Sequence, residues 1–97
     1  MTKSQVRIIH SPVTPAEALA DVRGYARAGR VEFTAHAVKR ARQRSVRIGE
    51  IVHALAYAHE CRREEGEKWR ALCRDRDGDL LEAVVVIEDG LLVVTLF

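Results

Sequence analysis

Three side chains at four-residue spacing suggest the chemistry of this sequence. His36, Arg40 and Arg44 follow one another every four residues. Because an α-helix turns about 100° per residue, they should form a row along one flank of a helix. An imidazole can transfer a proton, and guanidinium groups stabilise negative charge on phosphoryl oxygens. The row therefore suggests metal-independent cleavage of a phosphodiester, in which the RNA 2′-hydroxyl serves as the nucleophile, although a lone histidine near a helix start is more often structural.

The same helix is strongly basic. Five cations and no acid lie between Phe33 and Arg47, namely Lys39, Arg40, Arg42, Arg44 and Arg47. Like charges four residues apart destabilise a helix by roughly 0.2 to 0.5 kcal/mol per pair, a cost that a polyanion or acidic strands would remove. We therefore expect Lys39, Arg42 and Arg47 to contact nucleic acid. A non-catalytic module that binds nucleic acid or another protein through the basic helix 34–47 stays open as the alternative.

Other candidate sites are weaker. Trp69 beside Arg70 could stack a base next to a phosphate contact, although a tryptophan in an alternating strand is more often part of the core. Asp75, Asp77 and Asp79 begin like a calcium loop, but the glycine and glutamate that such a loop needs later are missing. We expect no metal and no cofactor.

The charge is distributed unevenly along the chain. Residues 1–47 contain ten Lys or Arg and three acids, whereas residues 48–97 contain six and eleven. A basic side can attract a polyanion such as RNA. The alternative is that the two halves neutralise one another in the folded protein.

Length and composition indicate one small cytoplasmic domain. The chain has 97 residues, with no apolar run long enough for a membrane span and no apolar region of a secretory signal near its start. Two cysteines, Cys61 and Cys73, are too few for a disulfide framework and are expected to be small buried residues.

Capping residues and periodicity predict three helices before residue 59. Thr14, Pro15 and Glu17 are typical of a helix start, and Gly29 suits the left-handed residue after its end. The helices are expected at about 15–28, 34–44 and 48–58. A short lead over residues 1–13, in which Val6, Ile8 and Ile9 could add a strand, precedes them.

From residue 59 the apolar pattern alternates, which indicates strands. Strands are expected at about 60–64, 68–75, 80–87 and 91–96. Asp89-Gly90 favours a two-residue turn that pairs Glu88 with Leu91 and Val84 with Thr95. The predicted fold is therefore α+β, a helical part (14–58) followed by a four-stranded antiparallel sheet (59–97) in a single domain, 1–97.

Both faces of the last two strands are largely apolar, so neither face can lie wholly in water. Helices can cover one face. The other is left for a concave site, a homodimer contact or a partner protein, which includes partners that pair with the terminal strand.

The sequence resembles the DUF4258 family of small bacterial proteins. The similarity covers about Val31 to Phe97 and rests on the following residues: Phe33-Thr34-x-His36-Ala37-x-x-Arg40-x-x-x-Arg44-x-Val46, then Glu50-Ile51 and Val93-Val94-Thr95-Leu96-Phe97. The resemblance implies an endoribonuclease toxin of a toxin–antitoxin module, with the layout of RelE-like and barnase-like ribonucleases. It implies RNA as substrate, an antitoxin of the zinc-finger type as partner, and functional roles for His36, Arg40, Arg44 and Thr95.

Two positions depart from the family pattern. Ser45 stands where the family has glycine between the second and third helices, and Arg47 stands where it has Ser or Thr. Serine has a steric cost if positive φ is needed at that point. Arginine cannot cap the third helix with a side-chain acceptor. Neither change affects the row of His36, Arg40 and Arg44.

Overall fold

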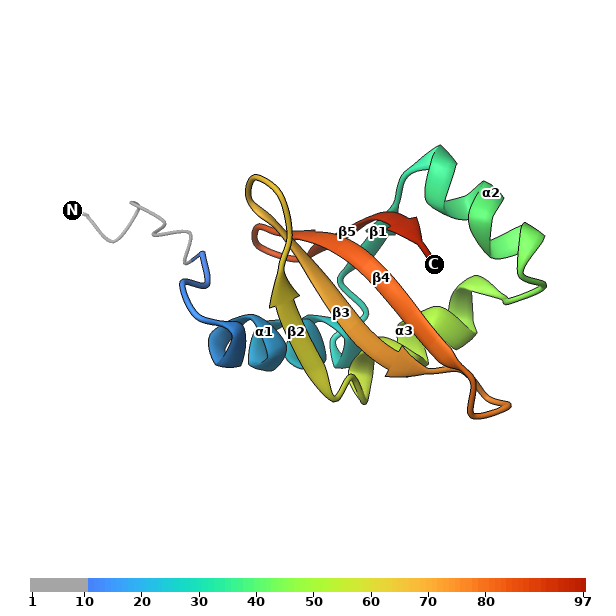
Figure 1. Ribbon diagram of the computed structural model, residues 1–97, viewed down its shortest axis with the longest axis horizontal. Helices are drawn as coiled ribbons and strands as arrows, with labels where there is room; N and C mark the ends of the chain where they lie inside the picture. Colours follow the sequence, from blue (N-terminus) through green and yellow to red (C-terminus); the bar gives the residue numbers. More distant parts are fainter. Residues whose placement is uncertain (1–10) are drawn as a thin grey trace.

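A computed structural model describes residues 11–97 and shows helices and strands close to the predicted ones (Figure 1). The suggested strand at Val6, Ile8 and Ile9 lies outside the described residues. The elements are α1 (Pro15–Arg27), β1 (Val31–Phe33), α2 (Ala35–Gln43), α3 (Ile48–Ala56), β2 (Glu60–Arg63), β3 (Lys68–Arg74), β4 (Leu80–Ile87) and β5 (Leu91–Leu96).

The protein is α+β, as predicted, but its sheet differs from the predicted one. Instead of four antiparallel strands, the sheet has five strands in the order β1-β5-β4-β3-β2, and β1 runs parallel to β5. The additional strand pairs Val31 with Leu91 and Phe33 with Val93. It was missed because only three residues alternate there, between Gly29 and Thr34.

Two helices cover one face of the sheet, and the third lies at its end. α1 packs against α3, β2 and the middle of the sheet, and α3 packs against β3. In Figure 1 both helices run along the same side of the strands, whereas α2 stands beyond the end of β5. Only two residues of α2, Ala37 and Ala41, are buried. A helix with so narrow an apolar stripe leaves most of its circumference exposed to solvent.

Helices α1 and α2 end in the same backbone motif. The N–H of Gly29 donates to Ala26 O and that of Arg30 to Tyr25 O, with Gly29 at φ 73°. In α2 the N–H of Ser45 donates to Arg42 O and that of Val46 to Ala41 O, with Ser45 at φ 58°. Both are Schellman motifs. Ser45 therefore occupies a left-handed position that glycine adopts without steric cost.

The β4–β5 hairpin has a different register from the predicted one near its turn. Ile87, rather than Glu88, pairs with Leu91, so that three residues form the turn. A bulge at Val84/Val85 then restores the predicted pairing of Val84 with Thr95. As a result Leu91 and Val93 point into the core, and Leu92 is 36% exposed.

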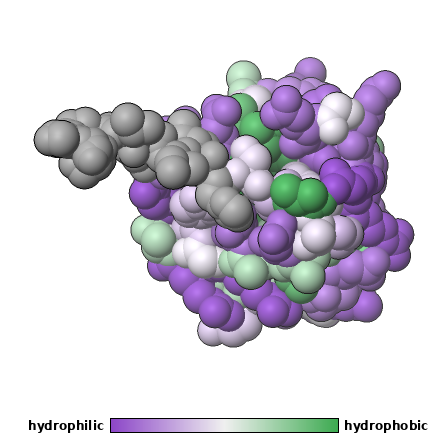
Figure 2. All heavy atoms as spheres, turned by 90° about the vertical axis from the view of Figure 1, so that its left-hand side faces the viewer, coloured by the Kyte–Doolittle hydropathy of each residue, from purple (hydrophilic) through white to green (hydrophobic). Residues whose placement is uncertain are grey.

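Cys61 and Cys73 are free and buried. Within residues 11–97, no helix has the length and apolar content needed to cross a membrane. The side of the molecule drawn in Figure 2 is mostly hydrophilic among its coloured residues, with hydrophobic ones in small separate groups.

Candidate nucleic-acid interface

The start of α2 is fixed to β5 by one residue. The Thr34 hydroxyl accepts a hydrogen bond from Ala37 N at 3.0 Å, as an N-cap does, and donates to Val94 O at 2.8 Å. The Thr34 N–H donates to Val93 O at 3.0 Å. Thr34 therefore caps the helix and sets its position on the strand with the same side chain.

The predicted row of His36, Arg40 and Arg44, which we call the α2 row, follows one flank of the helix. Arg40 Nε donates to Leu96 O at 3.1 Å, and Arg44 Nη2 donates to Leu80 O at 3.2 Å. His36 is exposed in the first turn. Helix geometry brings the row progressively nearer to the sheet, because Arg44 lies closest in angle to the buried Ala37 and Ala41.

The side chains of the α2 row differ in the partners that they bind. Arg44 also forms an ion pair with Asp75, at 3.9 Å between Nη2 and Oδ2. Its guanidinium is thus occupied by a carboxylate and a carbonyl. No hydrogen bond or ion pair joins the His36 side chain to another residue among 11–97. Among the described residues, His36 therefore lacks the hydrogen-bond partner that usually orients a catalytic imidazole.

Thr95 lies in β5, on the stretch of backbone that contacts α2. It pairs with Val84 in the sheet and is half-buried. Its neighbours Val94 and Leu96 supply the two carbonyls that Thr34 and Arg40 contact. Thr95 is brought close to the backbone under α2, but no hydrogen bond connects its side chain to His36 in the described part of the chain.

Three further cations, Lys39, Arg42 and Arg47, are the outer cations of α2 and its C-terminal loop. All three are exposed. Lys39 lies opposite the buried alanines and Arg42 about 120° from them, since each position advances about 100° around the helix. Within residues 11–97 no carboxylate lies within ion-pair distance of any of them. Their charges remain available to a ligand.

The acidic half of the chain does not neutralise this surface. Four ion pairs join residues of the second half to each other: Arg62–Glu60, Arg70–Glu64, Arg70–Glu82 and Arg76–Glu50. The ion pairs that join the two halves within residues 11–97 are Arg30–Asp89 and Arg44–Asp75. Of these, only the second involves α2.

The structure gives Trp69 and Arg70 roles other than the predicted nucleic-acid contacts. Trp69 is 3% exposed and belongs to the core, so its ring is not presented to a base. Arg70 donates to Glu82 Oε1 and Glu64 Oε2, each at 2.8 Å. These hydrogen bonds raise the pKa of Arg70 and lower that of Glu64. Arg70 is thus held between two carboxylates.

Phe97 is a neighbour of this surface that the sequence did not single out. Its ring lies 5.7 Å from the Arg40 guanidinium carbon and 4.5 Å from that of Arg70, and the residue is 45% exposed. Such distances allow cation–π attraction. The available signal was its position directly after β5, since its side chain shares a face with Glu82 and Thr95.

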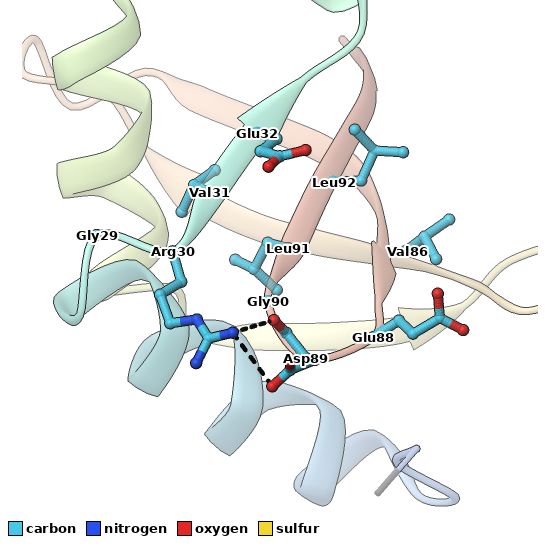
Figure 3. Close-up of a pocket in the computed structure, with 10 residues that line it drawn as sticks. All are labelled: Gly29, Arg30, Val31, Glu32, Val86, Glu88, Asp89, Gly90, Leu91 and Leu92. Carbon is cyan, nitrogen blue, oxygen red and sulfur yellow. Dashed lines mark hydrogen bonds and ion pairs between the residues drawn. The ribbon is translucent and has the colours of Figure 1, made fainter. Parts of the chain in front are cut away.

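A hollow lies at the other end of β5. It has a volume of about 530 Å³ and is bounded by β1 and the β4–β5 turn (Figure 3). Arg30 points to Asp89, with which it forms an ion pair at 3.2 Å. The other charged residues that line it, Glu32 and Glu88, are acidic. This hollow therefore offers little to a polyanion, in contrast to α2.

Comparison with known proteins gives a family but no activity. The family model described as "Domain of unknown function (DUF4258)" matches residues 33–97. The matched segment begins just before α2 and contains the α2 row, the outer cations and Thr95. No curated protein matches the chain.

Proposed function

Because this chain belongs to the DUF4258 family, which carries no assigned function, we propose a function from its surface: it binds RNA along α2. The observation that supports this proposal is the set of outer cations without acidic partners among residues 11–97. A bound polyanion would relieve their mutual repulsion and release counterions from the RNA. Arg40, fixed by the Leu96 carbonyl, would add a positioned phosphate contact beside them.

Cleavage of the bound RNA is a second candidate, favoured by the exposure of His36 one helical turn before Arg40. In this proposal His36 takes the proton of a 2′-hydroxyl, whose oxygen then attacks the adjacent phosphorus. The bond from phosphorus to the 5′-oxygen breaks, a 2′,3′-cyclic phosphate forms, and the leaving oxygen takes a proton from His36 or water. Arg40 stabilises the charge on the phosphoryl oxygens.

Such an activity would make the protein a ribonuclease toxin that an antitoxin must block. Thr95 would contact the substrate from the sheet side. Arg44 would act mainly by fixing the helix, because Asp75 and Leu80 already engage its guanidinium. An antitoxin that covers the outer cations would prevent RNA from binding.

Binding can be tested by fluorescence polarisation with a labelled single-stranded RNA at several salt concentrations. We expect Lys39→Gln and Arg42→Gln each to reduce the salt slope by about 0.7 to 1 unit. Arg62→Gln is the matched control, because Arg62 is an exposed arginine already paired with Glu60. Equal slopes for all four proteins would contradict RNA binding by α2.

Cleavage needs a separate readout. Wild-type protein and His36→Ala are incubated with end-labelled RNA in the presence of a chelator, and the products are separated by size. Cyclic-phosphate ends from the wild type but not from the variant would support cleavage. Intact RNA with the wild type, at concentrations that saturate binding, would leave the protein a non-catalytic RNA-binding module.

A further inference from the structure

A second hollow lies between α3 and the β3–β4 turn. Its volume is about 460 Å³, within the range of small-molecule sites. We call it the Tyr57 pocket. It combines two aromatic rings with charges of both signs, and the residues that bear on the argument are Glu50, His53, Tyr57, Arg74, Asp75 and Arg76.

The aromatic part of the Tyr57 pocket is presented to solvent rather than to the core. Tyr57, the C-cap residue of α3, is 65% exposed. His53 lies one turn earlier, with its ring centroid 5.0 Å from that of Tyr57 and the ring planes tilted by 49°. Rings that are largely exposed contribute little to the core, but they can stack on a nucleobase.

The charged part of the Tyr57 pocket contains two arginines, one at the end of β3 and one in the β3–β4 turn. Arg76 and Arg74 are both exposed. Arg76 lies 3.6 Å from Glu50, and Arg74 donates to Gly78 O at 3.2 Å. A third arginine, Arg27 of α1, lies 5.6 Å from the Tyr57 ring. Arg74 and Arg76 thus line the same pocket as the two rings, and Arg27 contacts the Tyr57 ring from outside that lining.

Asp75 connects the Tyr57 pocket to the α2 row. Its Oδ1 accepts hydrogen bonds from the backbone N–H groups of Asp77 and Asp79, each at 2.9 Å, so the turn holds the carboxylate in place. Its Oδ2 faces Arg44. One carboxylate therefore lines the pocket and contacts the end of the row, which makes the two sites adjacent.

We propose that the Tyr57 pocket holds one unstacked base of a single-stranded RNA whose backbone runs along α2. The base packs against Tyr57 and His53, and a neighbouring phosphate contacts Arg74, which, unlike Arg76, forms no ion pair among residues 11–97. This inference rests on the proposed RNA binding and adds a requirement for single strands, because the bases of a duplex are already stacked on each other. It assigns the pocket a role in strand selection, separate from any cleavage at His36.

The test uses a 12-nucleotide 2′-O-methyl RNA with one central 2-aminopurine, which cannot be cut by attack of its own 2′-hydroxyl, and its duplex with the complementary strand. We expect wild-type protein to bind the single strand more tightly and to quench its emission. Tyr57→Ala should lose both effects, with affinity lower by about tenfold, within the usual range for one stacked base. Tyr57→Phe should retain both, because it keeps the ring.

Two outcomes separate this inference from the RNA-binding proposal. If Tyr57→Ala binds and quenches like the wild type while Lys39→Gln binds more weakly, the base site is refuted and RNA binding stands. If the wild type binds neither the single strand nor the duplex, both proposals fail. Because Tyr57 is 65% exposed, the alanine variant should keep the fold, and circular dichroism checks it.

Discussion

Arg44 and Asp75 join the last turn of α2 to the β3–β4 turn, with 3.9 Å between Nη2 and Oδ2. This pair is the only ion pair of α2 within residues 11–97, and 10% of the Asp75 side chain is exposed. The carboxylate thus removes one cation from the surface that we propose for RNA. It also lies at the boundary between the α2 row and the Tyr57 pocket.

Asp75→Asn should therefore strengthen RNA binding. The amide oxygen can still accept the turn hydrogen bonds from Asp77 and Asp79. Because the carboxylate charge beside Arg44 is removed, its guanidinium becomes available to a phosphate. We expect the salt slope to steepen by about 0.7 units for a single strand. Asp77→Asn, an equal change of charge in the same turn, is the control. Weaker binding by Asp75→Asn than by this control would argue against a phosphate near Arg44.

Ser45→Gly should stabilise the fold. Ser45 is at φ 58° in the Schellman motif of α2, where a side chain is strained and glycine is not. We expect the free energy of unfolding to rise by about 0.5 to 1 kcal/mol, measured by urea denaturation. Gly29→Ser, at the same position of the α1 motif, should lower it by a similar amount. A lower free energy of unfolding for Ser45→Gly than for the wild type would refute strain at Ser45.

Arg47→Ser should increase stability and weaken RNA binding at once. Arg47 is the N-cap of α3 with φ −80° and ψ 151°, but its side chain makes no cap hydrogen bond. A serine hydroxyl there adds about 0.5 to 1 kcal/mol, because it accepts from a free N–H of the first turn. Thermal unfolding and the salt slope of binding measure the two effects. Arg47→Gln, which removes only the charge, should weaken binding without the gain in stability.

The buried thiols should make the protein less stable at high pH. Burial raises the pKa of Cys61 to about 11 and that of Cys73 to about 12. In the unfolded chain both thiols lose their protons near pH 8.5. The folded chain therefore binds more protons above that pH, and the free energy of unfolding falls as pH rises from about 8.5 through 11.

Urea denaturation between pH 8 and 11 measures this loss. Cys61→Ala and Cys73→Ala should each make the decline shallower, although each also leaves a small cavity. The maximum slope per thiol is about 1.4 kcal/mol per pH unit. A decline that is equally steep without either thiol would show that other groups cause it.

Local signals in the sequence predicted most of the fold. The helix and strand bounds agree with the prediction to within two residues, because caps, periodicity and turn residues act over short distances. β1 was missed because its pairing partner Leu91 lies 60 residues from Val31. The turn register was wrong because a three-residue turn and the Val84/Val85 bulge compensate each other.

The candidate site was predictable only in part, because tertiary contacts determine the partners of its side chains. Helical spacing predicted a row of His36, Arg40 and Arg44, and the structure has the first two in α2 and Arg44 at its C-cap. The guanidinium of Arg40 binds Leu96 O and that of Arg44 pairs with Asp75. These partners depend on tertiary contacts, which sequence spacing does not reveal. The burial of Trp69 and the exposure of Tyr57 likewise follow from how the layers pack.

The order of strands in the sheet has a consequence for synthesis of the protein. β5 lies between β1 and β4, yet it is translated after every other strand described here. Thr34 and Arg40 have no carbonyls to bind until β5 has emerged from the ribosome. A nascent chain therefore carries α2 without these two contacts until β5 has emerged, and the cations that we assign to RNA are put in place only then.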